Sequence, residues 1–392
     1  MVLLTRNHRV VFDCFRMKLN SLIVEWGSGG DRKLRRNLYP FRQIRVPFRF
    51  TLPLLFRMLR EEFGWYESSQ YLLSGRYGIF SAYVFDYRVR EFFRKNRPAG
   101  VLLFNDHVPA AISIRMAAQA KRIPTIYVPH ASVSTRFPPL KFDYALLEGE
   151  DMREKYRQCG TIESKVFLVG NVKFDEVQTQ EGERNSKILI GIGYNDLDNL
   201  VKVEDFIDNL KSLLDTQFGL GNYGIVLRPH PALNKRVGLS DSSVSESDPL
   251  VESSIQFLQR LHVLLSGNSN LILEGLLMGV PTHYFELEPS PVADNYGFVK
   301  RGLIDPPFTT AEEAVRRIEE SRRREWKISD RQREMLAEYN GAIGSEWEGK
   351  VGDRIAEIVD AIVDGKEAKY LSRDEAAGEV SVESHEPVVS RV

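Results

Sequence analysis

The sequence predicts an α/β protein made of two doubly wound domains, and three observations lead to this prediction. From about residue 98 to residue 285, short apolar runs alternate with longer segments of helical period. The loops between them are short, as parallel strand–helix–strand units require. A polar stretch at 181–186 divides the alternation into two series, and 392 residues suffice for two cores. We expect the two domains to face a cleft, with ligands at the carboxyl ends of the strands.

The first series predicts a domain over residues 1–180. Residues 99–105 (AGVLLFN) predict a buried strand, 109–122 a helix rich in alanine, and 124–129 (PTIYVP) the next parallel strand. Short strands at 142–147 and 165–169 enclose a charged helix at 150–158. Residues 10–15 and 22–25 are apolar enough to add further strands to this sheet.

The second series predicts a domain over residues 181–345. Strands are expected at 187–192, 223–227, 262–265 and 281–285, with helices at 197–214, 250–258 and 271–278. The chain is charged and helical from about 310 to 361, and we expect 346–365 to form a helix that packs back toward the first domain. Residues 366–392 have no period and predict a disordered tail.

Composition excludes several classes of protein. The net charge of -1 gives no support for a nucleic-acid partner. Two cysteines are too few for a disulfide framework, which indicates a reducing compartment, and no apolar run reaches the roughly 20 residues that span a bilayer. The expected location is therefore the cytoplasm.

The N-terminal region is strongly basic, with 13 Lys or Arg and three acidic residues among the first 60. Within it, residues 41–63 interleave arginines with Phe, Leu and Ile. Such a segment predicts peripheral contact with an anionic membrane surface, here the inner face of the cell membrane, although a solvated or interdomain face fits the same pattern.

Arg228 and His230 stand where a buried strand of the second series meets Pro229 and Pro231. The prolines are expected to end the strand and stiffen the backbone. A guanidinium fork suits phosphate oxygens, and an imidazole donates a hydrogen bond or transfers a proton. The alternative is that these side chains cap the strand and bind a carboxylate.

A polar turn of Ser266, Gly267, Asn268, Ser269 and Asn270 joins the next strand to a helix. A helix start with free N–H groups attracts anions, a glycine lets a phosphate approach the backbone, and hydroxyls add donors. Ser269 or Asn270 is expected to cap the helix. An ordinary cap with nothing bound is the alternative.

Three further features of the second domain are a carboxylate, a pair of glycines and a pair of aspartates. Glu274, about one turn into that helix, is placed to accept hydrogen bonds from ribose hydroxyls, unless it is an ordinary exposed helix carboxylate. Gly193 ends a strand at the same edge and joins the donor-binding candidates, although Gly191 and Gly193 lack the third glycine of a dinucleotide fingerprint. Asp196 and Asp198 have the spacing of a metal–nucleotide pair, but a helix start explains them better, so no metal site is predicted.

In the first domain, His130 ends a strand and Asp106, within Asn105-Asp106-His107, ends the preceding one. A histidine at a cleft suits a general base because its pKa lies near operating pH. Asp106 is then expected to orient His130 or to bind the acceptor. A buried histidine satisfied by backbone is the alternative.

From about residue 98 to residue 301 the chain resembles the GT-B superfamily, in particular the cell-surface polysaccharide branch of capsule glycosyltransferases, CDP-glycerol glycerophosphotransferases and HP-motif sialyltransferases. The resemblance lies in YVPHA, VGNVKFDE, RPHP and SGNSNLILEGLLMGVP. It implies two Rossmann-like domains, the first on the acceptor side and the second binding the nucleotide donor. It also implies that His130 is the base or acceptor contact, while His230, Ser266 and Ser269 contact the nucleotide phosphate.

These observations predict a metal-independent glycosyltransferase that needs no cofactor. Its partners would be a nucleotide-sugar or CDP-glycerol donor and a hydroxyl of a cell-surface polysaccharide or lipid-linked precursor. Asp106, His130 and His230 are the expected catalytic residues. The alternatives are a hydrolysing UDP-GlcNAc 2-epimerase-like enzyme and a non-catalytic GT-B-like binding protein.

Overall fold

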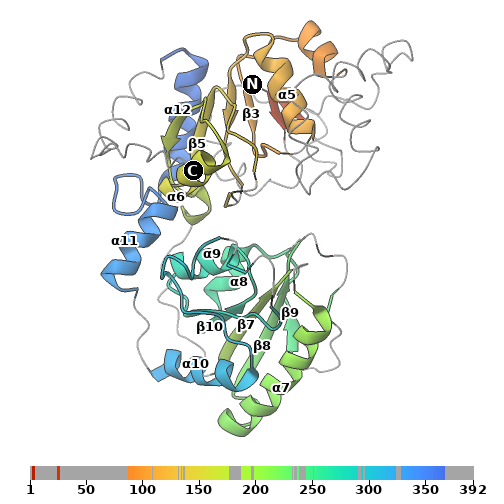
Figure 1. The fold of residues 1–392 in the computed structure, drawn as a ribbon, viewed down its shortest axis with the longest axis vertical. Coiled ribbons are helices and arrows are strands. Elements are labelled where there is room, and N and C mark those ends of the chain that lie inside the picture. The colour runs from red at the N-terminus through yellow and green to blue at the C-terminus, as the bar shows by residue number, and fades with distance from the viewer. Residues whose placement is uncertain are drawn as a thin grey trace, which may run out of the picture. The chain divides into compact units, whose positions relative to one another are not determined.

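The computed structural model falls into two compact units. Unit 1 comprises Met1–His130, Thr135–Gly170 and Lys350–Val392, and unit 2 comprises Ala131–Ser134 and Asn171–Gly349 (Figure 1). The structure describes residues 2–4, 24–26, 87, 89–107, 109–130, 132–133, 135, 137–175, 187–195, 198–231, 233, 236–237, 244–249, 251–289, 293–294, 296–323 and 328–366. The predictions for 10–15, 41–63, 181–186, Asp196 and the tail beyond 366 lie outside these residues.

Unit 1 is built on a parallel sheet of six strands in the order β2-β1-β3-β4-β5-β6. The strands are β1 (Val2–Leu4), β2 (Val24–Trp26), β3 (Val101–Leu103), β4 (Thr125–Tyr127), β5 (Tyr144–Leu147) and β6 (Lys165–Leu168). Its helices include α5 (Pro109–Gln119), α6 (Glu150–Cys159) and α12 (Val351–Val363). The strand order reverses between β1 and β3, which makes the carboxyl ends of these strands the place where such folds bind ligands.

Unit 2 is built on a parallel sheet of five strands in the order β11-β10-β7-β8-β9. The strands are β7 (Ile188–Tyr194), β8 (Tyr223–Pro229), β9 (Val244–Glu246), β10 (Val263–Ser266) and β11 (Thr282–Tyr284). Its helices include the 3-10 turn η5 (Val172–Phe174), α7 (Leu200–Phe218), α8 (Ser254–Gln259), α9 (Leu271–Leu277), α10 (Ala311–Arg323) and α11 (Asp330–Tyr339). Here the strand order reverses between β7 and β10.

The predicted fold class of two parallel-sheet, Rossmann-like domains is confirmed, with differences at particular elements. β8 extends two residues beyond its predicted end, to Pro229, which pairs in register with Tyr194 and is the last residue of the strand. The edge strand β9 lies in a polar stretch where no strand was predicted, and β1 was missed as well. The helix expected from residue 197 begins at Leu200, because the Asn199 side chain accepts a hydrogen bond from the Val201 N–H and caps it.

Side chains of the unit 2 sheet alternate between two apolar clusters, as the two-residue period of a strand requires. Ile190 and Ile192 belong to the cluster that α7 and α10 cover. Val226 and Leu264 belong to the opposite cluster, with Phe257 of α8. Both faces of the sheet are therefore buried.

Helix α12 belongs to unit 1 although it follows all of unit 2 in the chain. Figure 1 shows it, in blue, beside the strands of unit 1. Its apolar face is buried, including Ile355, Ile358 and Ile362. The Arg354 guanidinium donates a hydrogen bond to the carbonyl oxygen of Leu168 at 2.7 Å, directly at the end of β6. Among the described residues, no helix combines the length and the apolar composition needed to cross a membrane.

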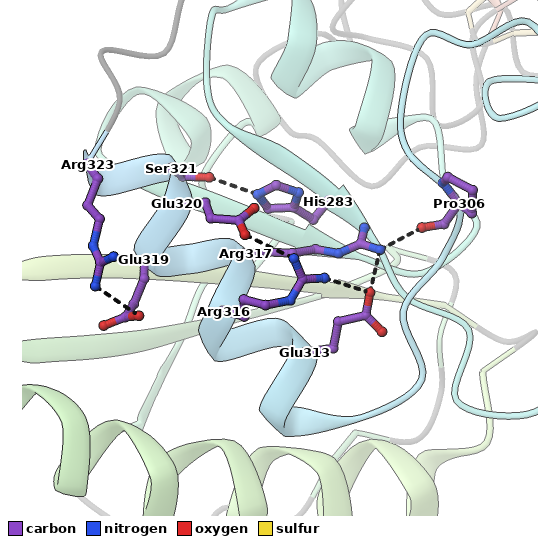
Figure 2. Close-up of polar contacts among 9 residues, drawn as sticks. All are labelled: His283, Pro306, Glu313, Arg316, Arg317, Glu319, Glu320, Ser321 and Arg323. Atoms are coloured by element: carbon purple, nitrogen blue, oxygen red, sulfur yellow. Dashed lines mark hydrogen bonds and ion pairs between the residues drawn. The ribbon is translucent and has the colours of Figure 1, made fainter.

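A buried histidine joins β11 to α10 in unit 2 (Figure 2). His283 lies 2.9 Å from the Ser321 hydroxyl through Nε2 and is 7% exposed. The neighbouring Arg317 donates to Glu313 and to the carbonyl oxygen of Pro306. Burial, followed by the charge of Arg317, lowers the pKa of His283 to about 4. The imidazole is therefore neutral in the folded protein at physiological pH.

This histidine is expected to make unit 2 less stable in acid. Between about pH 6.5 and pH 4 the unfolded chain binds a proton at His283 and the folded chain does not, so stability falls as pH falls. The interval from the ordinary pKa of 6.5 to about 4 corresponds to about 3 kcal/mol in total. Urea unfolding at several pH values should show this extra fall in the free energy of unfolding in the wild type and not in His283→Gln. Parallel curves of free energy against pH for the two proteins would contradict the prediction.

Candidate functional site

Three strand ends of unit 2 are joined at the carboxyl edge of its sheet. The Gly267 N–H donates to the carbonyl oxygen of Gly193 at 2.9 Å, which ties the turn after β10 to the end of β7. The His230 N–H donates to the carbonyl oxygen of Tyr194 at 2.9 Å, which ties the turn after β8 to the same strand. The structure thus brings together His230, Gly193 and Gly267, which the sequence placed on three separate elements. This edge includes the point of strand reversal.

Asn195, which sequence reasoning missed, connects these turns through its side chain. Its Nδ2 donates to the carbonyl oxygen of Asn268 at 2.8 Å, and its N–H donates to the Asp198 carboxylate at 2.8 Å. A Cβ placed on Gly267 would lie 2.5 Å from the same Asp198 carboxylate. The space beside Gly267 is therefore filled by Asp198, not left open for a phosphate as expected. The signal for Asn195 was its place directly after the first strand of the domain.

The polar turn before α9 uses its side chains partly on its own backbone. The Ser266 hydroxyl is fully buried and donates to the carbonyl oxygen of the next residue at 3.0 Å. The Ser269 hydroxyl accepts from the Leu271 N–H at 3.3 Å and so caps the helix. Asn270 stands at the N-cap position but makes no side-chain cap; its Oδ1 accepts from the Ser132 hydroxyl at 2.6 Å. Ser132 belongs to the short segment that clusters with unit 2.

Arg228 is buried at the end of β8, with 8% of its surface exposed. Its guanidinium donates to the Ser247 hydroxyl at 2.6 Å and to the carbonyl oxygen of Glu252 at 3.0 Å, and it lies over the Phe257 ring. Burial lowers the pKa of Arg228 below its ordinary value, although an arginine stays charged. These contacts match the strand-capping part of the alternative, since Arg228 holds the loops after β9, but among the described residues its hydrogen bonds go to a hydroxyl and a backbone carbonyl, not to a carboxylate.

Glu274 is buried in α9, which excludes an ordinary exposed helix carboxylate. Its Oε1 lies 3.1 Å from the ammonium group of Lys173 in η5, and the two side chains are 7% and 15% exposed. The turn that carries Lys173 is itself fixed, because the Asn171 N–H donates to the Asn340 side chain at 3.0 Å. The predicted VGNVKFDE motif therefore supplies the cation that holds Glu274.

In unit 1 the loop after β3 carries a buried carboxylate at the point of strand reversal. Asp106 accepts a hydrogen bond of 2.5 Å from the Tyr156 hydroxyl, which also contacts the Tyr127 hydroxyl at 3.1 Å. Its other oxygen lies 2.9 Å from Nδ1 of His107. Burial, and next the charge of Asp106, raises the pKa of both Tyr127 and Tyr156 well above the ordinary value. Both phenols therefore remain protonated, and the Tyr156 hydroxyl donates to Asp106.

His130 follows β4 but is not oriented by Asp106. Its Nδ1 lies 2.6 Å from the carbonyl oxygen of Phe104, at the end of β3. A carbonyl only accepts, so Nδ1 carries the proton and Nε2 carries the lone pair in the neutral ring. Among the described residues the Asp106 carboxylate contacts His107 and Tyr156 instead. The expectation that Asp106 orients His130 is therefore wrong.

Sequence reasoning missed the partners of Asp106. His107 was read as part of the same loop without a role, and Tyr156 was read only as part of a charged helix. Tyr156 is one of four buried residues of α6, and a buried hydroxyl needs a hydrogen-bond partner. An aromatic hydroxyl on the apolar stripe of a helix beside a strand-end carboxylate was the available signal.

The described residues contain no group of three or more His, Cys, Asp and Glu side chains placed to hold a metal ion. A hollow of about 710 Å³ in unit 1 lies beside the last turns of α6, between Arg153 and Val166. None of the predicted site residues lines it, so we place the candidate site at the strand ends.

No protein-family model matches the sequence, and no curated protein matches it significantly. Solved structures do match. A putative UDP-N-acetylglucosamine 2-epimerase from Listeria monocytogenes aligns with a TM-score of 0.59 and 11% identity, covering 93% of this chain and 96% of the other. The UDP-N-acetylglucosamine 2-epimerase from Rickettsia bellii aligns with a TM-score of 0.56 and 15% identity, covering 93% of this chain and 96% of the other. The UDP-GlcNAc 2-epimerase from Methanocaldococcus jannaschii, in complex with UDP-GlcNAc and UDP, aligns with a TM-score of 0.54 and 12% identity, covering 92% of this chain and 98% of the other. These matches confirm the GT-B fold class over nearly the whole chain.

Proposed function

We propose that this chain is an enzyme that acts on a nucleotide-activated donor and transfers its sugar, or glycerol phosphate, to a hydroxyl of a cell-surface polysaccharide or a lipid-linked precursor. The observation that carries the proposal is the joined carboxyl edge of unit 2, where the ends of β7, β8 and β10 meet at the strand reversal. Doubly wound sheets bind nucleotides at this position. The fold is shared with UDP-GlcNAc 2-epimerases, one of them in complex with UDP-GlcNAc and UDP.

The donor is assigned to unit 2. His230 is exposed and lies on the turn bonded to the end of β7, so its ring is proposed to donate to the departing phosphate. Asn268 and Ser269 add polar groups from the turn after β10. The Asp198 carboxylate occupies the space beside Gly267 and would repel a phosphate there. We therefore assign the phosphates to the His230 side of this edge. Arg228 holds the loops beside this position.

The acceptor and the proton transfer are assigned to unit 1. His130 is fixed through Nδ1 at the end of β3, and Asp106 lies in the loop that follows that strand. Both residues therefore lie at the carboxyl edge of the unit 1 sheet, near its strand reversal. His130 is proposed as the base or the contact to the acceptor hydroxyl.

The second candidate is a hydrolysing 2-epimerase that acts on UDP-GlcNAc. It is favoured by the similarity of fold to three such enzymes over more than nine-tenths of this chain. Such an enzyme would release free nucleotide and an epimerised sugar without any acceptor. A transferase would instead release nucleotide in step with a glycosylated product.

Thermal unfolding with nucleotides tests the common basis of both candidates. The full chain is heated with UDP, CDP, CMP, GDP, UDP-GlcNAc and CDP-glycerol, with Mg²⁺ or with EDTA. A ligand at a hundredfold its Kd stabilises the folded state by about 2.7 kcal/mol, so one base is expected to raise the Tm by several degrees, equally in EDTA. An unmoved Tm with every nucleotide at millimolar concentration would overturn the proposal.

Product analysis then separates the two candidates. The donor that raises the Tm is incubated with and without bacterial surface glycan, and its products are followed by NMR. Nucleotide release that requires the glycan supports transfer. A free epimerised sugar formed without the glycan supports the 2-epimerase. Binding without release of nucleotide under either condition would favour a non-catalytic binding protein.

A further inference from the structure

We propose that His107, held by Asp106, is the group that takes the proton from the acceptor hydroxyl. The inference rests on the proposed function, in which His130 is either the base or the contact to the acceptor hydroxyl. It assigns the role of base to His107. It places the base in a hydrogen-bonded chain of Tyr127, Tyr156, Asp106 and His107, leaving His130 as the acceptor contact.

Hydrogen bonds fix both the carboxylate and the ring. Asp106 is held from one side by Tyr156, whose hydroxyl donates to Oδ2 at 2.5 Å. From the other side its Oδ1 lies 2.9 Å from Nδ1 of His107. The His107 ring also packs on the Phe137 ring, with centroids 4.5 Å apart. Both torsions of the imidazole are thereby restrained.

The same contacts select the tautomer of His107. A carboxylate that accepts from the ring places a proton on Nδ1 and, in the neutral ring, the lone pair on Nε2. The Asn105 side chain is consistent with this choice. Its Oδ1 accepts from the His107 N–H at 3.0 Å, which fixes the amide orientation and turns its NH₂ group toward Nε2 at 3.5 Å. A nitrogen lone pair supported by a carboxylate behind the ring is what a general base requires, and the acceptor hydroxyl would displace the Asn105 amide from Nε2 to reach it.

Burial differs sharply between the two members of the pair. The Asp106 side chain is 3% exposed and the His107 side chain is 17% exposed. A buried carboxylate behind a partly exposed imidazole allows the ring to meet a substrate while the charge that stabilises an imidazolium stays in place. Within the described part of the chain, the titratable groups around Asp106 are His107, Tyr156, Tyr127 and, more distantly, Cys159. The pair also follows β3, at the strand reversal of unit 1.

The proposed step is a single proton transfer coupled to substitution. Nε2 of His107 takes the proton from the acceptor hydroxyl while that oxygen forms a bond to the reacting carbon of the donor sugar. The bond from this carbon to the phosphate oxygen breaks, and its electron pair leaves with the nucleotide. Asp106 is a positioning residue here, because it acts through the ring and stabilises the imidazolium until the proton is released to water.

The kinetic test uses the nucleotide sugar that raises the Tm, beginning with UDP-GlcNAc, and measures UDP release across pH 5 to 9. We expect His107→Gln to lower kcat at least a hundredfold, with the donor KM unchanged, and to remove the acid limb of the pH profile. Asp106→Asn should retain an acid limb at lower pH. His130→Gln is the matched control and should raise the acceptor KM while keeping the acid limb.

A structural measurement needs no substrate. Nitrogen-15 NMR of the histidine rings in the full chain should show His107 protonated on Nδ1, and Tyr156→Phe should perturb that ring while His130 stays unchanged. A proton on Nε2 of His107, or a His107→Gln variant with wild-type kcat and acid limb, would overturn the proposal. A wild-type protein that turns over no donor would overturn the proposed function. The ring-proton measurement does not test that function, because it needs no turnover. If His107→Gln does not fold, Asp106→Asn carries the kinetic test.

Discussion

Replacing His230 with alanine is expected to lower kcat at least a hundredfold and to leave the melting temperature unchanged. The side chain is exposed, whereas the turn itself is held by backbone hydrogen bonds to Tyr194 and from Leu233 that the substitution keeps. Removing one preorganised donor to a charge that develops in the transition state costs about 2.7–4 kcal/mol. Because the loss applies to the transition state, kcat should fall more than the donor KM rises.

The matched variant is His230→Gln, which keeps an N–H donor of similar reach but cannot carry a positive charge. It is expected to recover part of the activity that His230→Ala loses. Turnover is measured with the donor that raises the Tm, and folding is checked by circular dichroism. A His230→Ala enzyme with normal turnover and an intact fold would remove His230 from the site.

Replacing Lys173 with methionine is expected to lower the free energy of unfolding by about 3–5 kcal/mol. The substitution leaves the Glu274 carboxylate, which is 7% exposed, without the ammonium group that lies 3.1 Å away. A buried charge without its partner is costly because water no longer solvates it. Urea unfolding of the full chain measures the loss of free energy of unfolding. Tryptophan fluorescence and backbone circular dichroism, followed together, report whether the loss belongs to a single unfolding transition.

The double variant Lys173→Met with Glu274→Gln removes the unpaired charge and should recover most of the loss. The surface pair Arg316–Glu320 supplies a control, since its side chains are 59% and 55% exposed. Arg316→Met should cost at most about 1 kcal/mol, because exposed ion pairs contribute little. Equal losses for Lys173→Met and Arg316→Met would show that burial does not govern the Lys173–Glu274 pair.

The strands of both sheets were predictable where apolar residues run without interruption. Residues 188–194 and 223–229 are almost wholly buried, because helices cover both faces of a parallel sheet, and such strands read as continuous apolar runs. β9 lies at the edge of its sheet, where only Val244 is buried and Ser245 is exposed. An edge strand of this kind has no apolar pattern to detect.

The positions of the candidate-site residues at the strand ends were predictable, and the side chains that they contact were less so. Polar residues after parallel strands meet at one edge, so Asp106, His130, His230 and the 266–270 turn were found from their positions. Their partners were not, because these lie far along the chain. Tyr156 is 50 residues from Asp106, and Glu274 is 101 residues from Lys173. These side-chain contacts depend on how the helices pack on the sheet, and the local sequence does not specify that packing.

The position of α12 has a consequence for the order in which the chain is made. Residues 171–349 of unit 2 are synthesised before residues 351–363, so unit 1 remains without α12 until unit 2 has left the ribosome. During that interval the surface that receives Ile355, Ile358 and Ile362 is bare, and the carbonyl oxygen of Leu168 lacks its Arg354 donor. The first unit to begin is therefore the last to be completed, and nascent chains stalled between 349 and 363 should be the ones that bind chaperones.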